Sequence, residues 1–246
     1  MLRKIPAFPE SCFLWLRPQN CTLILYSSLF LTMPLIKEWE SDPFSLAAVW
    51  KIEEPESFFT DKTGILSDIK NEKRRIERQA GRFLLKHLKH DFPLLDIAPD
   101  ASDKPRIPQN SYFFSISHSF PYIAAVVSPY AEAGIDIQCY HPRILTLQEK
   151  YLSAEEQQFT QNDSRLATLA WCAKEAAYKW QGKRGVEFID HLPIIAWSQE
   201  KEKTHIKINL QLTIPKWTLD LEGIVSESFA LSVVSNSTEN LNLSIT

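Results

Sequence analysis

Two helical stretches, each followed by short apolar strands, constrain the fold of this chain most strongly. In residues 68–89, apolar side chains recur at helical spacing, and Lys and Arg occupy the opposite face. Residues 164–180 carry a second apolar stripe of leucines, alanines and Trp180. Strands are expected at residues 44–52, 112–117, 122–128, 135–137, 194–197, 206–214, 217–221 and 229–234. Because the order of helix and then strands occurs twice, we predict an α+β fold. It would have two similar α/β halves related by a pseudo-twofold, each a small antiparallel sheet packed with a long helix.

This pattern divides the chain into four segments. The three strands between residues 112 and 137 are expected to form an antiparallel meander that the first helix covers. Ser153 and Glu156 have the spacing of a capping box, which predicts a helix start. The predicted segments are an extension at 1–32, an N-terminal half at 33–135, a C-terminal half at 136–235 and a polar tail at 236–246.

The extension at 1–32 does not have the pattern of a signal peptide. Its apolar patches are interrupted by Arg17 and Pro18, and no small-residue cleavage site follows its short apolar run at 23–31. Met33 then opens a segment that is typical of an ordinary protein start. We expect residues 1–32 to have no role in the chemistry; a vestigial export signal is the alternative.

The composition excludes several classes of protein. The 246 residues include 30 acidic and 27 basic side chains, so a net charge of −3 gives no global attraction to nucleic acid or to an acidic membrane surface. Cys12, Cys21, Cys139 and Cys172 form no CxxC pair, which argues against a zinc site or a disulfide framework. We therefore expect a reduced, cytoplasmic setting. No apolar run has the length needed to span a bilayer.

Two acids on different elements are the first candidates for chemistry. Asp136 lies in the short strand Gly134–Gln138, and Glu175 lies between Lys174 and Lys179 on the second helix. If these elements pack side by side, the two carboxylates form a gap suited to a divalent cation, and the lysines flank bound phosphates. The alternatives are a turn acid and an ordinary surface Glu–Lys pair. Apolar neighbours on the helix favour a partly buried polar site instead.

Other polar groups have two interpretations each. His118, between two serines, is either a phosphate contact or a structural histidine, and the spacing does not decide. Arg78 and Arg82 lie four residues apart on the basic face of the first helix, where they are either solvated or a two-pronged phosphate clamp. Lys104 stands beside the rigid Pro105. Lys183 and Arg184 form either a mobile loop near phosphate or a simple turn.

Four segments together resemble the 4′-phosphopantetheinyl transferase superfamily, specifically its longer, pseudo-dimeric class, which primes peptide, polyketide and fatty-acid synthases. They occur in the family's order and at family-like separations, and they span most of residues 33–234. Residues 1–32 lie outside the resemblance. The segments are Asp103-Lys104-Pro105, Phe114-Ser115-Ile116-Ser117-His118-Ser119, Gly134-Ile135-Asp136-Ile137-Gln138 and Trp171-Cys172-Ala173-Lys174-Glu175-Ala176-Ala177-Tyr178-Lys179.

The resemblance implies a reaction and a role for each candidate. Phosphopantetheine would pass from coenzyme A to a serine of an apo carrier protein, with release of 3′,5′-ADP. Asp136 and Glu175 would hold Mg²⁺ against the pyrophosphate, and Glu175, directly or through a water on the metal, would take the serine's proton. Lys179 would stabilise the leaving 3′,5′-ADP. Coenzyme A would be bound by Ser117 and His118 at its phosphates, by Lys104 at the adenylate end, by Arg78 at the 3′-phosphate and by Lys174 near the phosphates.

One position departs from the family. Members of this class often have a third acid where this chain has Gln138. A glutamine amide offers a carbonyl oxygen to a cation but no charge, so we expect weaker metal binding and more reliance on Asp136 and Glu175.

Two other functions compete with the transferase. One is a non-catalytic module that binds coenzyme A or a carrier protein; the other is an unrelated α+β enzyme that hydrolyses phosphate esters. The expected partner is a carrier protein that is acidic near its modified serine, with no nucleic acid and no membrane. Leu145, Leu147 and Tyr151 are the predicted docking surface, with ordinary core packing as the alternative. Because both halves supply faces of the site, we expect a monomer.

Overall fold

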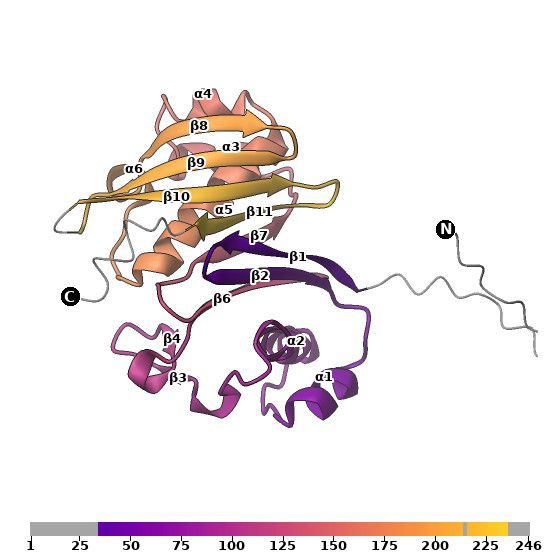
Figure 1. Ribbon diagram of the computed structural model, residues 1–246. Helices are drawn as coiled ribbons and strands as arrows, with labels where there is room; N and C mark the ends of the chain where they lie inside the picture. Colours follow the sequence, from indigo (N-terminus) through magenta and orange to yellow (C-terminus); the bar gives the residue numbers. More distant parts are fainter. Residues whose placement is uncertain (1–33, 214–215, 236–246) are drawn as a thin grey trace, which may run out of the picture. The chain divides into compact units, whose positions relative to one another are not determined.

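A computed structural model describes residues 34–213 and 216–235 (Figure 1). The predicted extension at 1–32 and the predicted polar tail at 236–246 lie outside the described residues. The described residues belong to one compact unit. Among the described residues, no helix is both long enough and apolar enough to cross a membrane.

The first sheet is antiparallel and has the strand order β1-β2-β6-β5. Three of its strands were expected, whereas β1, an edge strand, was not predicted. The alternation of half-buried and exposed residues along most of β1 fits that edge position. The strands are β1 (Leu35–Asp42), β2 (Ser45–Lys51), β5 (Phe113–Ser119) and β6 (Tyr122–Ser128).

The second sheet is also antiparallel, with the order β7-β11-β10-β9-β8. Its strands are β7 (Ile135–Cys139), β8 (Ile194–Glu200), β9 (Lys203–Leu210), β10 (Trp217–Val225) and β11 (Phe229–Ser235). The predicted meander is therefore wrong in its third strand, because β7 pairs with β11 instead of joining β5 and β6. Gly134 supplies the physical reason. It passes so close to helix α5 (Ser164–Gln181) that a Cβ there would collide with the carbonyl oxygen of Ala176, which commits the next strand to the second sheet.

Two long helices flank the sheets, close to the predicted bounds. Helix α2 (Glu72–Leu88) begins at Asn71, whose side chain accepts a hydrogen bond from the backbone of Arg74. Helix α5 (Ser164–Gln181) begins at Asp163 and ends at Gly182, whose φ of 67° is the left-handed cap that glycine favours. A third helix, α1 (Glu56–Thr63), was not predicted. The shorter elements are η1 (Leu94–Asp96), β3 (Ala98–Pro99), β4 (Pro105–Arg106), η2 (Pro108–Asn110), α3 (Ile144–Leu147), η3 (Gln148–Lys150), α4 (Gln157–Thr160) and α6 (Phe188–His191).

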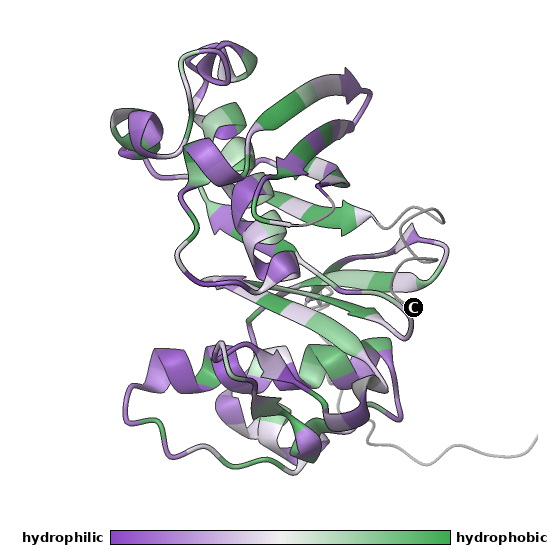
Figure 2. Ribbon diagram, turned by 90° about the vertical axis from the view of Figure 1, so that its left-hand side faces the viewer, coloured by the Kyte–Doolittle hydropathy of each residue, from purple (hydrophilic) through white to green (hydrophobic). Residues whose placement is uncertain are grey.

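Three apolar clusters hold these elements in layers. The first lies between α2 and the first sheet, the second between the two sheets, and the third between the second sheet and α5. In Figure 2 the strands in the middle of the view are mostly pale to deep green, which marks apolar residues. The mixture of helices and antiparallel sheets agrees with the predicted α+β class.

Candidate active site

Asp136 is a buried carboxylate held from three sides. On β7, Ile135 and Ile137 face the cluster between the sheets, so Asp136 and Gln138 face α5. Asp136 is 6 % exposed, and its Oδ1 accepts a 2.6 Å hydrogen bond from the Ser117 hydroxyl. Lys179 Nζ lies 2.6 Å from the same oxygen. Burial, followed by the Asp136 charge and a hydrogen bond to Asp136, raises the pKa of the Cys172 thiol, so Cys172 stays protonated against this carboxylate.

Alternate serines of β5 join the first sheet to β7. Ser115, Ser117 and Ser119 share one face of the strand because successive side chains point to opposite faces. Ser115 Oγ accepts a hydrogen bond from the backbone N–H of Ile135 at 3.3 Å, and Ser119 Oγ accepts one from Cys139 at 2.9 Å. Both β5 and β7 are edge strands, so these hydroxyls replace a strand ladder and fix the position of Asp136.

Helix α5 brings an acid and a cation to this carboxylate. Lys179 Nζ also donates to the carbonyl of Ile135 at 3.1 Å, so Lys179 joins β7 to α5 and does not form a simple surface pair with Glu175. Burial and, after it, the Asp136 charge raise the pKa of Glu175, while Lys179 opposes the shift; together they place this pKa at about 7. The structure therefore brings Asp136, Ser117, Glu175 and Lys179 together as the sequence predicts.

These residues fit the Mg²⁺ that the resemblance implies. The ion takes oxygen ligands and is commonly held by one or two carboxylates together with substrate phosphates. Asp136 and Glu175 supply two carboxylates, and Lys179 supplies one positive charge beside them. Gln138 shares the face of Asp136, and its amide N–H donates to the carbonyl of Cys139. Within the described residues, no group of three His, Cys, Asp or Glu side chains could hold a metal.

Lys174 lies in a different environment from the predicted one. Its side chain is 0 % exposed, and its ammonium lies 2.6 Å from Glu156 and donates to the carbonyl of Phe188. Burial lowers the pKa of Lys174, while the Glu156 partner opposes that shift. Because a fully buried, paired ammonium has no access to a ligand, we remove Lys174 from the coenzyme A site; it anchors α5 to the rest of the second half.

The sequence predicted the capping box of Glu156 but not its ion pair with Lys174. The predicted capping box forms, because Ser153 N–H donates to Glu156 at 2.6 Å and Glu156 N–H donates to Ser153 Oγ at 3.2 Å. This capping box lies in the turn that precedes α4, and α4 itself begins only at Gln157. The same carboxylate accepts a hydrogen bond from the backbone of Ile194 and pairs with Lys174. Nothing in the local pattern around Ser153 indicates this buried pair.

Lys104 connects a loop of the first half to the end of α5. Its Nζ donates to Glu132 at 2.9 Å and to the carbonyl of Trp180 at 3.0 Å. Arg106 pairs with the same Glu132 and with Asp100. A pocket of about 260 Å³ opens here, with Lys104, Phe114, Tyr178, Lys179 and Gly182 among the residues that line it. Lys104 therefore borders a space beside Lys179, but its ammonium is already paired.

His118 and Arg78 are not brought to Asp136. His118 points away from Ser117, toward α2, where its Nδ1 lies 3.5 Å from Glu77; its side chain is 55 % exposed. Arg78 is exposed on α2, and Arg82 is half-buried one turn later. Burial, and then the charge of Arg78, lowers the pKa of Arg82 to about 10. The two arginines lie one helical turn apart on α2, which packs on the opposite face of β5 from Asp136.

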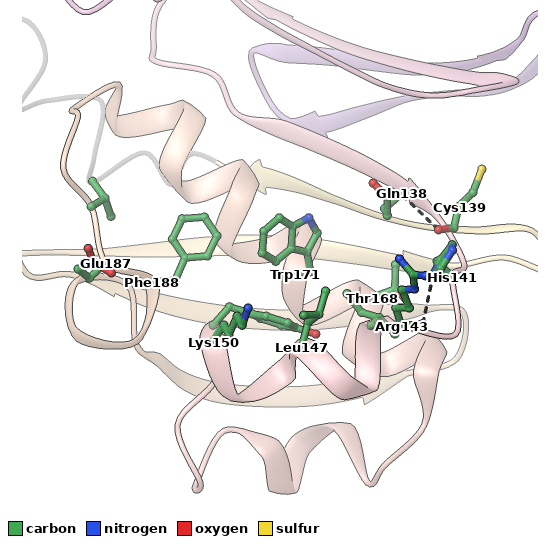
Figure 3. A pocket seen from close by; sticks show the side chains of 13 residues that line it. Gln138, Cys139, His141, Arg143, Leu147, Lys150, Thr168, Trp171, Glu187 and Phe188 are labelled. Carbon is green, nitrogen blue, oxygen red and sulfur yellow. Dashed lines mark hydrogen bonds between the residues drawn. The ribbon is translucent and has the colours of Figure 1, made fainter.

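A larger pocket of about 610 Å³ adjoins the acidic cluster (Figure 3). Gln138 and Trp171 line it, the latter one turn before Glu175 on α5. Of the predicted docking residues, Leu145 is half-buried and Leu147 is exposed. Tyr151 is 2 % exposed, and its hydroxyl donates to the carbonyl of Ala167. The prediction of Tyr151 as a docking residue is therefore corrected, because it belongs to the core of the second half.

Comparison with known proteins agrees with this geometry in the second half of the chain. Residues 132–234 match the family model of the 4′-phosphopantetheinyl transferase superfamily. Among curated proteins, none matches the chain. The matched segment contains β7, α5 and the second sheet, with Asp136, Glu175 and Lys179. Over these residues the chain is similar to the 4′-phosphopantetheinyl transferases, and this similarity supports a function in phosphopantetheine transfer in general.

Proposed function

We propose that this protein transfers 4′-phosphopantetheine from coenzyme A to a serine of an apo acyl or peptidyl carrier protein, with Mg²⁺, and releases 3′,5′-ADP. The observation that carries the proposal is the cluster of Asp136, Glu175 and Lys179, which lies inside the matched segment. A protein that only binds coenzyme A has no need of a buried carboxylate that is paired with a lysine and has a second acid beside it.

Three side chains would perform the chemistry. When bound, Mg²⁺ supplies positive charge that neutralises the pyrophosphate; Asp136 and Glu175 would hold it, with the amide oxygen of Gln138 as a further ligand. Glu175 stands beside Asp136 and Lys179 and would be the acid that takes the proton of the carrier serine. The serine oxygen forms a bond to the β-phosphorus while the bond to the ADP oxygen breaks. Lys179 stabilises the charge that develops on that leaving oxygen.

Both halves of the chain would bind coenzyme A, which is why we assign the longer, pseudo-dimeric class and a monomer. The adenosine end would occupy the pocket beside Lys104 and Tyr178, because this pocket opens next to Lys179. The 3′-phosphate would meet Arg78, Arg82 and His118. Cys139 and Cys172 are free thiols, which fits a cytoplasmic protein.

The larger pocket is our proposed surface for the carrier protein. Its wall contains the exposed Leu147, and Arg143 and Lys150 stand at its edge, as Figure 3 shows. An apolar patch with basic neighbours is complementary to a carrier that is acidic around its serine. The position of this patch beside Gln138 would bring the serine toward Glu175.

Mass spectrometry tests the proposal. Apo acyl carrier protein incubated with the protein, coenzyme A and Mg²⁺ should gain the mass of one phosphopantetheine. EDTA or Glu175→Ala should abolish the gain, and excess Mg²⁺ should reverse the effect of EDTA. Glu202→Ala, which removes an exposed acid far along the chain from this cluster, is the matched control and should retain the gain.

Two other outcomes would identify the competing functions. Coenzyme A binding without modification of any of several carrier proteins would identify a binding module. The missing third acid at Gln138 would then be the first explanation to test for the lack of turnover. Release of phosphate from simple phosphate esters without a carrier protein would identify a hydrolase.

A further inference from the structure

Helix α2 and strand β5 pack in a regular register. Gly81 lies so close to β5 that a Cβ there would be 3.1 Å from Ile116. One turn earlier, Glu77 lies beside His118, and one turn before that, the Lys73 ammonium lies 4.9 Å from the ring centre of Phe120. Each step of four residues on the helix matches two residues on the strand, because a helical turn and a strand pair have similar lengths.

Glu77 stands out in this register because it is a buried acid on a basic helix. It is 6 % exposed, although Lys73, Arg74, Arg75 and Arg78 surround it in the sequence. Among the described residues, its one ion pair is with His118, at 3.5 Å from Nδ1. Burial of a carboxylate costs free energy unless a partner compensates it, so this placement requires an explanation.

The geometry leaves the other side of the imidazole open. Glu77 contacts Nδ1, and more than half of the His118 side chain is exposed. When an imidazole binds an anion, the ring nitrogen that does not face the anion needs an acceptor inside the protein. Glu77, whose carboxylate lies 3.5 Å from Nδ1, is placed to be that acceptor, and its burial keeps it away from an approaching phosphate.

We propose that Glu77 is a positioning residue that holds the His118 ring so that its Nε2 faces a phosphate of coenzyme A. The proposal rests on the proposed function, since it takes coenzyme A as the ligand. Glu77 does not itself touch the ligand. Gly81 contributes to the same arrangement, because it lets α2 approach β5 closely enough for Glu77 to reach His118.

A double-mutant cycle measured by calorimetry tests this role. We expect Glu77→Gln to weaken coenzyme A binding by about fivefold, the equivalent of one net hydrogen bond. In the background of His118→Ala, the same change should have no further effect, because its route to the ligand is gone. In turnover assays the Glu77→Gln effect should appear in KM for coenzyme A and leave kcat nearly unchanged.

Glu72→Gln is the matched control. It removes the same charge from the exposed first turn of α2, and it should leave coenzyme A affinity within twofold of the wild type. Wild-type affinity in Glu77→Gln, or equal losses in both backgrounds, would overturn the positioning role alone. Equal losses of coenzyme A affinity in Glu72→Gln and Glu77→Gln would show that the net charge of α2 causes the effect, and this result would also overturn the positioning role. Failure of the wild-type protein to bind coenzyme A would overturn the proposed function together with this inference.

Discussion

Helices α2 and α5 have nearly the same length but differ in the burial and ion pairing of their charged side chains. Ten of the eighteen residues of α5 are buried, against seven of the seventeen of α2. On α5, Lys174 and Lys179 each contact a carboxylate of another element, whereas Arg74 and Arg78 on α2 are exposed. Desolvation makes unpaired charges costly on the buried helix and nearly free on the exposed one. Changes to the buried charges of α5 should therefore affect folding and chemistry, and changes to the exposed charges of α2 should affect binding alone.

The largest effect is expected from the buried pair on α5. Lys174→Met leaves Glu156 buried without its cation, and we expect a loss of about 3–5 kcal/mol in the free energy of unfolding. Urea denaturation measures this loss. Arg74→Met on the exposed face of α2 is the matched change and should alter stability by less than about 0.5 kcal/mol. Similar losses in the two variants would remove the contrast between the helices.

Glu175 should make stability depend on pH. Its folded pKa of about 7 lies above the 4.5 that is usual for an exposed glutamate, so the folded state holds the proton more tightly, and stability falls as pH rises between these values. At pH 8 in EDTA, Glu175→Gln should be more stable than the wild type by roughly 3 kcal/mol, from 1.4 kcal/mol per pKa unit. The difference should disappear below about pH 4. Thermal melts across pH check this, and a gap that is constant from pH 4 to pH 8 would contradict it.

Arg78 on α2 should change binding without changing the chemical step. Arg78→Ala removes one prong of the proposed phosphate clamp, so we expect KM for coenzyme A to rise by about tenfold with kcat within twofold. Lys179→Met on α5 is the opposite case and should lower kcat by roughly a hundredfold. Steady-state kinetics of carrier modification separate the two. A kcat loss in Arg78→Ala comparable to that of Lys179→Met would place α2 in the chemical step.

The smallest effect is expected at Gln138, beside the α5 cluster. Gln138→Glu adds a third acid on the face of β7 that carries Asp136, so we expect half-maximal activity at a lower Mg²⁺ concentration, by a few fold. Titration of activity with Mg²⁺ measures it. Gln138→Met, of similar size but without the amide oxygen, is the control and should not lower that concentration. An unchanged Mg²⁺ requirement in Gln138→Glu would mean that residue 138 is not near the ion.

Local sequence patterns predicted the long helices and most strands well, but they missed the edge strand β1 and gave β7 the wrong partner. The long helices and most strands lie where periodicity placed them, because a buried face requires apolar residues at a fixed spacing. Strand β1 was missed, since an edge strand buries only part of its side chains and leaves a weaker signal. Strand β7 was placed correctly, but its partner was not, because the close approach of Gly134 to α5 is a contact across 42 residues of sequence.

The same division holds for the site. Motif spacing predicted Asp136, Glu175 and Lys179 as site residues, because each motif is local, and the structure packs β7 and α5, which carry them, against each other. The sequence did not predict the ion-pair partners of three carboxylates, because each partner lies on a different element, far along the chain. These carboxylates are Glu77, Glu132 and Glu156. Lys174 lies one position before Glu175 and yet faces the core, because neighbouring residues on a helix point about 100° apart.

The sequence by itself determined most of the segments that form helices and strands and which acids and lysines lie close together along them, since propensity, periodicity and capping act over a few residues. Only the tertiary structure decided which charges are buried and with which partner each is paired. It turned Ser117 toward Asp136 and His118 toward Glu77, and it fixed Lys174 on Glu156. The reason is that desolvation and ion pairing depend on neighbours from distant segments, and packing alone brings these neighbours together.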